Sequence, residues 1–489
     1  GVLDDIREPS DRGFQISVHF DIFTNPLRMT PYRNTEANET KAQNIVRFLV
    51  ANSKLYGYGV ASGNSRTAIY YKATDITSAD AITEAWTAPT DNEAASGGNR
   101  EQRAFFYYKN YIYGFSGTTV LWRYGDITAT PTFTETYQTL TAFTDVAQPV
   151  RHPADDIAYF FTDNKVHKLN NTTWTEAALT LPDNLIITDA EPVGNFLAIA
   201  CKPKNAGENS VVYLWDRDSS VTTMSSQIDF GEGDLLYIAY LDGLLIGVVD
   251  YYLNTNSLNL SRGKLIIKVA SGDKARMIKE FQQTADDTLQ IVPNSGSGSA
   301  YRTKIVRDNR MYFPVAISEQ SDTWRGIAVV DSQARLTMEL VEEDATSNGI
   351  QGIFLLGNYW FIAHTADGSI NRMDDGANYT YTSILHTQKY NLDDASVTKK
   401  LLSVTVMTAP LPIAGQVVLK YRINEETTWT TIFTNTTDNS ISRTAINIES
   451  SGANLPQYKE IQFRVESTGG AEITGYKFKS EIIDSDITD

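Results

Sequence analysis

Pairs of adjacent carboxylates are the residues of this chain whose type and spacing come closest to a catalytic arrangement. Two carboxylates that flank a sugar bond can act as acid and base in glycoside hydrolysis. Adjacent residues of a strand, however, point to opposite faces, so neighbours in sequence make a poor catalytic pair. We therefore interpret the acids as solvated loop charges and predict no catalytic residue. The pairs are Asp155 and Asp156, Glu342 and Glu343, Asp374 and Asp375, Asp393 and Asp394, and Glu425 and Glu426.

Nucleophilic and metal-binding chemistry has no better support. The Ser-Gly run at residues 295–299 comes nearest to a nucleophile elbow, but its composition is that of a flexible loop. Cys201 ends an apolar run that predicts a buried strand, where a thiol acts as a small hydrophobe. No phosphate-binding or dinucleotide-binding motif is present, and the five histidines share no metal-ligand spacing. We predict no metal and no cofactor. The histidines are His19, His152, His167, His364 and His386.

Four tryptophans beside Thr-rich turns could stack on sugar rings. Trp86, Trp174, Trp324 and Trp429 are these residues. Packing between sheets is the commoner role of such side chains, because a tryptophan carries a large apolar surface. We expect them to belong mainly to the core.

Length and charge restrict the class of protein. The 489 residues predict two or three domains, or one large β architecture with an appendage. The balance of 42 Lys and Arg against 59 Asp and Glu, a net charge of −17, disfavours tight binding of DNA, although DNA could slide past such a surface. No run approaches the roughly 18 apolar residues of a membrane span, and residues 1–11 carry acids where a signal peptide is basic. We expect a soluble protein.

A recurring hairpin pattern indicates the fold. A turn residue, an alternating apolar run with an aromatic, a polar turn and a second strand recur seven times, from near residues 52, 110, 158, 195, 242, 309 and 358. The mean spacing of about 50 residues is typical of four-stranded propeller blades. With 26 Tyr, 20 Phe and 7 Trp, the composition also favours strands. The sequence predicts an all-β fold with an irregular β-propeller of about seven blades.

The last hundred residues follow a different pattern. Runs such as 401–406, 417–423, 461–466 and 476–482 alternate apolar and polar residues between Gly, Asn, Asp and Pro turns. This pattern predicts a C-terminal β-sandwich. The polar, turn-rich stretch after Tyr390 places the boundary, with a propeller over residues 1–390 and a sandwich over 391–489.

Three segments remain ambiguous. Residues 39–54 and 274–283 have apolar spacings compatible with short helices. The N-terminal residues, about 1–45, contain Pro26 and Pro31, which impose an extended path. This extended arm is either a strand that closes the ring or an arm that docks on a neighbouring subunit. The candidate contact residues of such an arm are Phe20, Ile22, Phe23, Pro26, Leu27 and Tyr32.

The run from Phe20 to Pro31 and the junction Lys399 to Val406 prompt a comparison with a known group. With this architecture, the chain resembles virion proteins of tailed bacteriophages that join a propeller to a β-sandwich, especially tail-nozzle and hub proteins of short-tailed phages. The resemblance implies a non-enzymatic structural subunit, made in the host cytoplasm and located in the virion tail. It further implies a ring of identical subunits that contacts other virion proteins and takes part in DNA retention or ejection. No functional residue is transferred by it.

Two other classes of protein stay open. One is a carbohydrate-binding or carbohydrate-cleaving protein that recognises a receptor on behalf of a phage tail or a cell surface. The other is a bacterial surface adhesin, which the N-terminal composition disfavours.

Overall fold

The computed structural model describes residues 14–483 with some gaps, and every regular element in the described part is a β-strand. Besides the two ends, the structure leaves the following residues undescribed: 25–27, 33–34, 40–43, 61–66, 74–85, 89–102, 206, 221–225, 254–261, 283–289, 294–302, 320–321, 343–349, 357–358, 365–369, 374–378, 380, 388, 392–395, 437–442 and 448–455.

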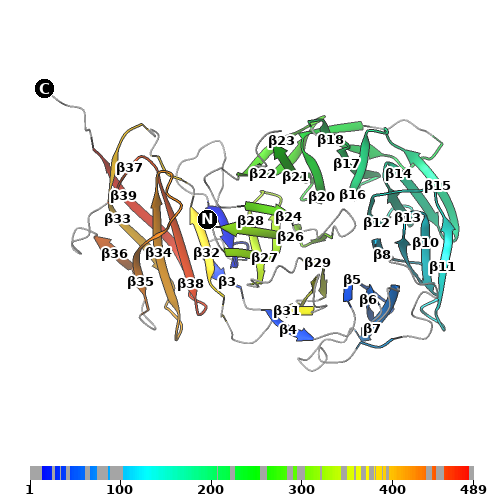
Figure 1. Cartoon of the computed structure of the whole chain (residues 1–489), viewed down its shortest axis with the longest axis horizontal. Coiled ribbons are helices and arrows are strands. Elements are labelled where there is room, and N and C mark those ends of the chain that lie inside the picture. Colours follow the sequence, from blue (N-terminus) through cyan, green and yellow to red (C-terminus); the bar gives the residue numbers. More distant parts are fainter. Residues whose placement is uncertain are drawn as a thin grey trace.

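Seven antiparallel blades follow one another along the described chain and form a ring (Figure 1), and a parallel bridge between β19 and β23 joins blades four and five into one sheet. Blade one contains β5 (Asn44–Ala51), β6 (Lys54–Val60) and β7 (Thr67–Ala73). Blade two contains β8 (Arg103–Tyr108), β9 (Tyr111–Ser116), β10 (Val120–Gly125) and β11 (Thr132–Thr139). Blade three contains β12 (Val146–His152), β13 (Ile157–Thr162), β14 (Lys165–Asn170) and β15 (Thr173–Thr180). Blade four contains β16 (Leu185–Val193), β17 (Phe196–Pro203), β18 (Asn209–Trp215) and β19 (Ser226–Glu232). Blade five contains β20 (Asp234–Leu241), β21 (Leu244–Leu253), β22 (Arg262–Ser271) and β23 (Lys274–Gln282).

The last two blades depart from this regular order. In blade six two short strands, β24 (Gln290–Pro293) and β25 (Ile305–Arg307), both pair with β26 (Arg310–Glu319), which is followed by β27 (Asp322–Asp331) and β28 (Leu336–Glu342). Blade seven contains β29 (Ile350–Leu356), β30 (Tyr359–His364) and β31 (Ile370–Met373). Its fourth strand is β4 (Thr35–Glu39), from the N-terminal part of the chain. An N-terminal strand therefore completes the last blade and closes the ring.

These sheets confirm the predicted all-β propeller. Each of the seven predicted hairpins is the second and third strand of one blade. The first strands of successive blades contact one another around the axis, except that β20 of blade five contacts β26, the second strand of blade six. Stacking in a ring buries both apolar faces of each sheet, which no single blade could do alone. Aromatic rings fill the resulting seams, as where Tyr58 of blade one stacks on Phe105 of blade two.

The C-terminal part of the chain forms the predicted β-sandwich. One sheet contains β32 (Ser383–Thr387), β38 (Ile461–Thr468), β34 (Gln416–Ile423) and β35 (Thr430–Asn435). The other, which we call the outer sheet, contains β33 (Lys399–Thr408), β36 (Arg443–Asn447), β37 (Gln457–Tyr458) and β39 (Ile473–Ile482). Buried Leu401, Val404, Leu419 and Phe463 form part of the core of the sandwich.

The sandwich and the propeller share one continuous sheet. Strand β1 (Phe14–Val18) pairs in parallel with β28 of blade six and antiparallel with β32 of the sandwich. The sandwich therefore uses strands from both sides of residue 391, because β32 precedes that residue and β1 comes from the N-terminal arm. Backbone hydrogen bonds across the junction connect the two modules more firmly than a flexible linker would.

The two segments with helix-compatible spacing are strands, so that expectation was wrong. Residues 44–51 form β5 and residues 274–282 form β23. Each strand lies next to a tight turn of residues with positive φ, Asn52 and Ser53 in one case and Gly272 in the other. Pairing with β6 and with β22 outweighs the weak helical preference of short apolar runs.

Candidate functional site

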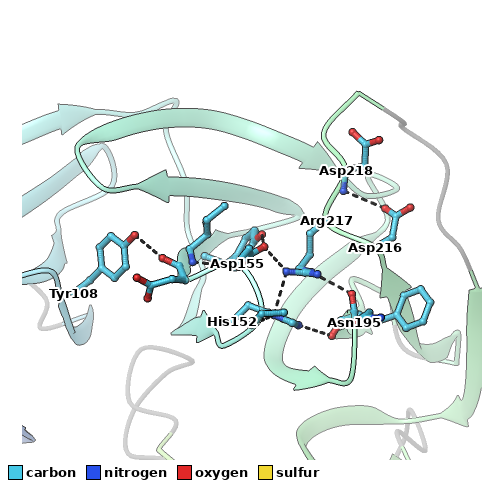
Figure 2. Close-up of polar contacts among 12 residues, drawn as sticks. Tyr108, His152, Asp155, Asn195, Asp216, Arg217 and Asp218 are labelled. Atoms are coloured by element: carbon cyan, nitrogen blue, oxygen red, sulfur yellow. Dashed lines mark hydrogen bonds and ion pairs between the residues drawn. The ribbon is translucent and has the colours of Figure 1, made fainter.

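The turn between β12 and β13 carries the acids Asp155 and Asp156 and is the centre of a polar network over three blades (Figure 2). Asp155 forms an ion pair with Arg217, which follows the third strand of blade four. Its carboxylate also accepts hydrogen bonds from the Tyr159 hydroxyl at 2.9 Å and from the Ile157 amide at 3.2 Å. Burial raises the pKa of Tyr159, and its hydrogen bond to Asp155 raises it further. The phenol therefore stays protonated and serves as a donor.

The Asp156 side chain points towards blade two, on the other side of blade three from Arg217. Its carboxylate pairs with Lys109, in the turn between the first and second strands of blade two, and with Arg151 of its own blade. The hydrogen bond from Lys109 holds the pKa of Asp156 below its usual value, and Arg151 adds to this effect. The Asp156 carbonyl accepts a hydrogen bond of 2.7 Å from Tyr108, as Figure 2 shows. The turn therefore joins blade three to blades two and four.

His152 lies beside this turn as a buried neutral imidazole. Its Nε2 donates to the Phe196 carbonyl at 3.1 Å, and its Nδ1 accepts from the Ala154 amide at 3.2 Å and from Arg217 at 3.1 Å. Burial lowers the pKa of His152, and the adjacent Arg217 guanidinium lowers it further. Because both ring nitrogens are engaged, the imidazole has no position open for a substrate proton.

Chemically, this arrangement neutralises charge and joins blades. Both carboxylates face cations, and the histidine is held in one tautomer by its partners. Asp155, which is largely withdrawn from water beside Arg217, departs from the expectation of a solvated loop charge, whereas Asp156 is a solvent-exposed turn acid as expected, although it is paired. In the part of the chain that the structure describes, no three His, Cys, Asp or Glu side chains gather closely enough to hold a metal ion.

Other blade junctions have hydrogen bonds at the positions that correspond to the Asp155–Arg217 ion pair, but between other residue types. The Asn52 amide donates to the Ile127 carbonyl at 3.3 Å between blades one and two, and the Asn171 backbone amide donates to Tyr108 at 3.1 Å between blades two and three. The Ser332 hydroxyl donates to Asp242 at 2.6 Å between blades five and six. In each case the turn after the first strand of one blade meets the turn after the third strand of the next. Sequence analysis missed these pairs because their residue types differ.

A second polar cluster lies at the propeller axis. Lys304, next to β25 of blade six, pairs with Asp189 at 2.7 Å and Glu191 at 2.9 Å on β16 of blade four. It also donates to the Ile238 carbonyl on β20 of blade five. Burial opposes the charge of Lys304, but the two carboxylates outweigh it and the pKa of Lys304 lies above its usual value. One cation therefore joins three blades near the axis.

Bulges in the first strands help to place these axial side chains. The register of the first strand shifts in blades one, two, three, four, five and seven, for example between Ile187 and Asp189. A bulge turns a side chain away from the regular alternation. In blade three, Gln148 lies within such a bulge and receives a hydrogen bond of 3.4 Å from Arg47 of blade one. Its own amide donates to the Phe105 carbonyl of blade two at 2.9 Å.

The other candidates of the sequence analysis have ordinary structural roles where the structure describes them. Cys201 is fully buried, as predicted, and burial raises the pKa of its thiol. Of the four tryptophans only Trp324 of blade six is buried in the core, whereas the other three are half-buried and pack on neighbouring rings: Trp86 on Phe48, Trp174 on His167 and Trp429 on His386. Glu425 and Glu426 are exposed. Residues 295–299, 374–375 and 393–394 lie outside the described residues, as do the side chains of Glu342 and His364.

The N-terminal arm packs within its own chain. Phe20, Ile22 and Phe23 are buried in the cluster that also forms the sandwich core, and half-buried Tyr32 lies against His19. Pro26 and Leu27 lie outside the described residues. Within the single chain the apolar surface of these three side chains is buried against the sandwich, and the strand that closes the ring is β4 rather than the run from Phe20 to Tyr32; docking of this run on a neighbouring subunit stays a prediction.

Together these features define a seven-bladed β-propeller joined to a β-sandwich. No family model and no curated protein sequence matches the chain. In the part described, no helix is long and apolar enough to cross a membrane.

Solved structures with a similar fold include three proteins. The N-terminal domain of Nup159 is 12% identical, with a TM-score of 0.42 over 73% of this chain and 98% of that one. Hydrazine synthase of Kuenenia stuttgartiensis is 11% identical, with a TM-score of 0.44 over 68% and 96% of the two chains. YCF48 from Cyanidioschyzon merolae is 8% identical, with a TM-score of 0.39 over 70% and 98%. At these identities the likeness is one of fold, and no functional argument follows from it.

Proposed function

We propose that the chain is a non-enzymatic structural subunit of a tailed-bacteriophage virion, a nozzle or hub component of the tail. In this proposal it is made in the host cytoplasm and assembles as a ring of identical subunits. The ring contacts other virion proteins and takes part in DNA retention or ejection, without binding DNA tightly.

The observation that supports a structural role is the use made of the ionisable side chains. Asp155 and Asp156 join three blades on one face, and Lys304 joins three blades near the axis. Groups that could perform acid and base chemistry are thus engaged in holding the ring of blades together. This use suits a rigid building block that must resist mechanical load.

The side chains near the propeller axis also indicate where DNA could pass. Side chains of blades one, three, four and six bond across the first strands, through Arg47 to Gln148 and through Lys304 to Asp189. A DNA path would therefore run between subunits and not through the propeller axis. The net charge of −17 would keep DNA from adhering to such a path, because few counterions would be released on contact.

The mass of the native particle tests the proposal. A ring predicts a fixed multiple of 54.4 kDa by native mass spectrometry, and an assembled-particle map would show whether the subunit borders the tail axis. A particle of one chain that degrades a host glycan would overturn the proposal in favour of a carbohydrate-cleaving protein.

A further inference from the structure

Exposed apolar side chains gather on one end of the propeller. Because the first strand of every blade pairs antiparallel with the second, the turns between these two strands all lie at one end of the propeller, which we call the turn face. Of the eight most exposed large apolar side chains in the described residues, five flank these turns. They are Val50 of blade one, Phe196 of blade four, Tyr240 and Leu244 of blade five, and Val306 of blade six.

Four of these five residues lie on three consecutive blades, four, five and six. Tyr240 and Leu244 flank the same two-residue turn, Asp242 and Gly243, and are 41% and 42% exposed. Exposed apolar side chains that gather at one end of a folded protein indicate an interaction site. Leu241, Leu245 and Ile246, which lie next to these two residues, are buried, so the exposure is local to Tyr240 and Leu244.

Exposed acids surround the patch. Asp216 and Asp218 lie on the turn after the third strand of blade four, and Asp242 lies between Tyr240 and Leu244. The nearby guanidinium of Arg217 is already paired with Asp155. Hydrogen bonds from Ser220 lower the pKa of Asp218, so that it is ionised at neutral pH. The surface that fits this patch must therefore be apolar and positively charged.

The outer sheet of the sandwich offers exposed lysines beside a partly exposed methionine. On β39, Tyr476 and Phe478 pack against the sandwich core, so Lys477 and Lys479 point to the opposite face, where both are exposed. Half-buried Met407 lies on the neighbouring strand β33, beside Thr405, the cross-strand partner of Lys477. One acid, Glu481, lies opposite Lys400. Figure 1 shows this sheet on the side of the sandwich that is farther from the propeller.

We propose that the turn face of one subunit docks on the outer sheet of a second copy of this chain. Tyr240 and Leu244 would meet the apolar part of the outer sheet, with the acids of the turn face near Lys477 and Lys479. Turn face against turn face is disfavoured, because it would bring the same carboxylates together. A contact between two different surfaces of the same chain is a head-to-tail contact. Repeated from subunit to subunit, it generates a ring when the rotation that relates neighbouring subunits returns the last subunit to the first. This inference rests on the proposed ring assembly and identifies its interface.

Complementation between two variants tests the interface. Tyr240→Asp/Leu244→Asp changes only the turn face, and Lys477→Glu/Lys479→Glu changes only the outer sheet. We expect each variant alone to be a single chain by size-exclusion chromatography with light scattering, with self-association weakened at least a hundredfold. A one-to-one mixture retains one intact interface and should form a two-chain particle. Met277→Asp, at an exposed position on the outer strand of blade five, should keep the mass of the unaltered particle.

The possible failures are distinguishable. A single chain for the unaltered protein overturns both the ring and this interface. A ring whose mass neither double variant changes overturns the interface and leaves the ring in place. Absence of a two-chain particle in the mixture, with both variants showing the far-UV circular dichroism and melting temperature of the unaltered protein, also overturns the interface.

Discussion

Asp155 and Asp156 are neighbours in the sequence, yet their carboxylates pair with cations on opposite sides of blade three, Arg217 of blade four and Lys109 of blade two. Because one turn thus joins three blades, the removal of either acid affects a junction between blades and not merely a loop. The two junctions differ in solvent exposure. Arg217 and Asp155 are 12% and 26% exposed, against 43% and 37% for Lys109 and Asp156.

The first prediction compares these two acids. Asp155→Ala should lower the free energy of unfolding by about 1–3 kcal/mol, because it leaves the largely buried Arg217 without its carboxylate. Asp156→Ala should have a smaller effect, since water can solvate Lys109 and Arg151 in its place. Urea denaturation of both variants would measure the difference, with exposed Glu425→Ala as the control. Equal stability of Asp155→Ala and the unaltered protein would show that the ion pair contributes nothing.

The second prediction concerns the axial cation. Lys304→Met should destabilise the protein by about 3–5 kcal/mol, because Asp189 stays buried without a counter-charge. The double variant Lys304→Met/Asp189→Asn should recover part of that loss. Lys202→Met is a matched control, because its pair with Asp234 is more exposed, and it should cost about 1 kcal/mol or less. A loss for Lys304→Met no greater than that for Lys202→Met would contradict a structural role of the axial cluster.

The third prediction concerns acid stability. Burial lowers the pKa of His19 and of His167 to about 4, from 6.5 in an unfolded chain. At pH values between these two, the unfolded state binds more protons than the folded state. The contribution of each histidine is therefore fully present above pH 6.5 and decreases as the pH falls towards 4, by about 3 kcal/mol per histidine. The urea midpoint measured at several pH values should follow this course.

A single substitution identifies the source of that pH dependence. His167→Gln replaces the imidazole by a side chain that does not titrate and that can still bond the Thr162 hydroxyl, which lies 2.7 Å from the ring nitrogen. The dependence of the unfolding free energy on pH between 6.5 and 4 should become shallower in this variant. An unchanged slope would assign the acid sensitivity to other groups.

The fourth prediction tests the role of the N-terminal arm. Phe20→Ala should cost about 3–5 kcal/mol of stability in a single chain, because Phe20 is fully buried in the chain's own core. Val50→Ala, at an exposed position, should change the free energy of unfolding by no more than about 0.5 kcal/mol. If Phe20→Ala left the single chain as stable as before and impaired only assembly, the arm would be a contact to another subunit.

The sequence was sufficient for the repeated part of the fold. Each hairpin of second and third strands is local, because its apolar alternation and its turn residues lie within a few tens of residues. The alternation along residues 401–406 and 476–482 likewise predicted strands of the sandwich, which the structure places in β33 and β39. The buried positions of Cys201 and Trp324 followed from the same local patterns.

Tertiary structure alone decided the contacts between distant segments. Strand β1 lies between β28 and β32, more than three hundred residues away, and no local pattern of its five residues specifies either partner. Arg217, Lys109 and Lys304, which meet Asp155, Asp156 and Asp189 from other blades, are likewise brought near by the closure of the ring, not by spacing. Apolar alternation determines which face of a strand is buried. The partner of a polar side chain depends instead on which turns and bulges the closed ring places within a few ångströms of each other.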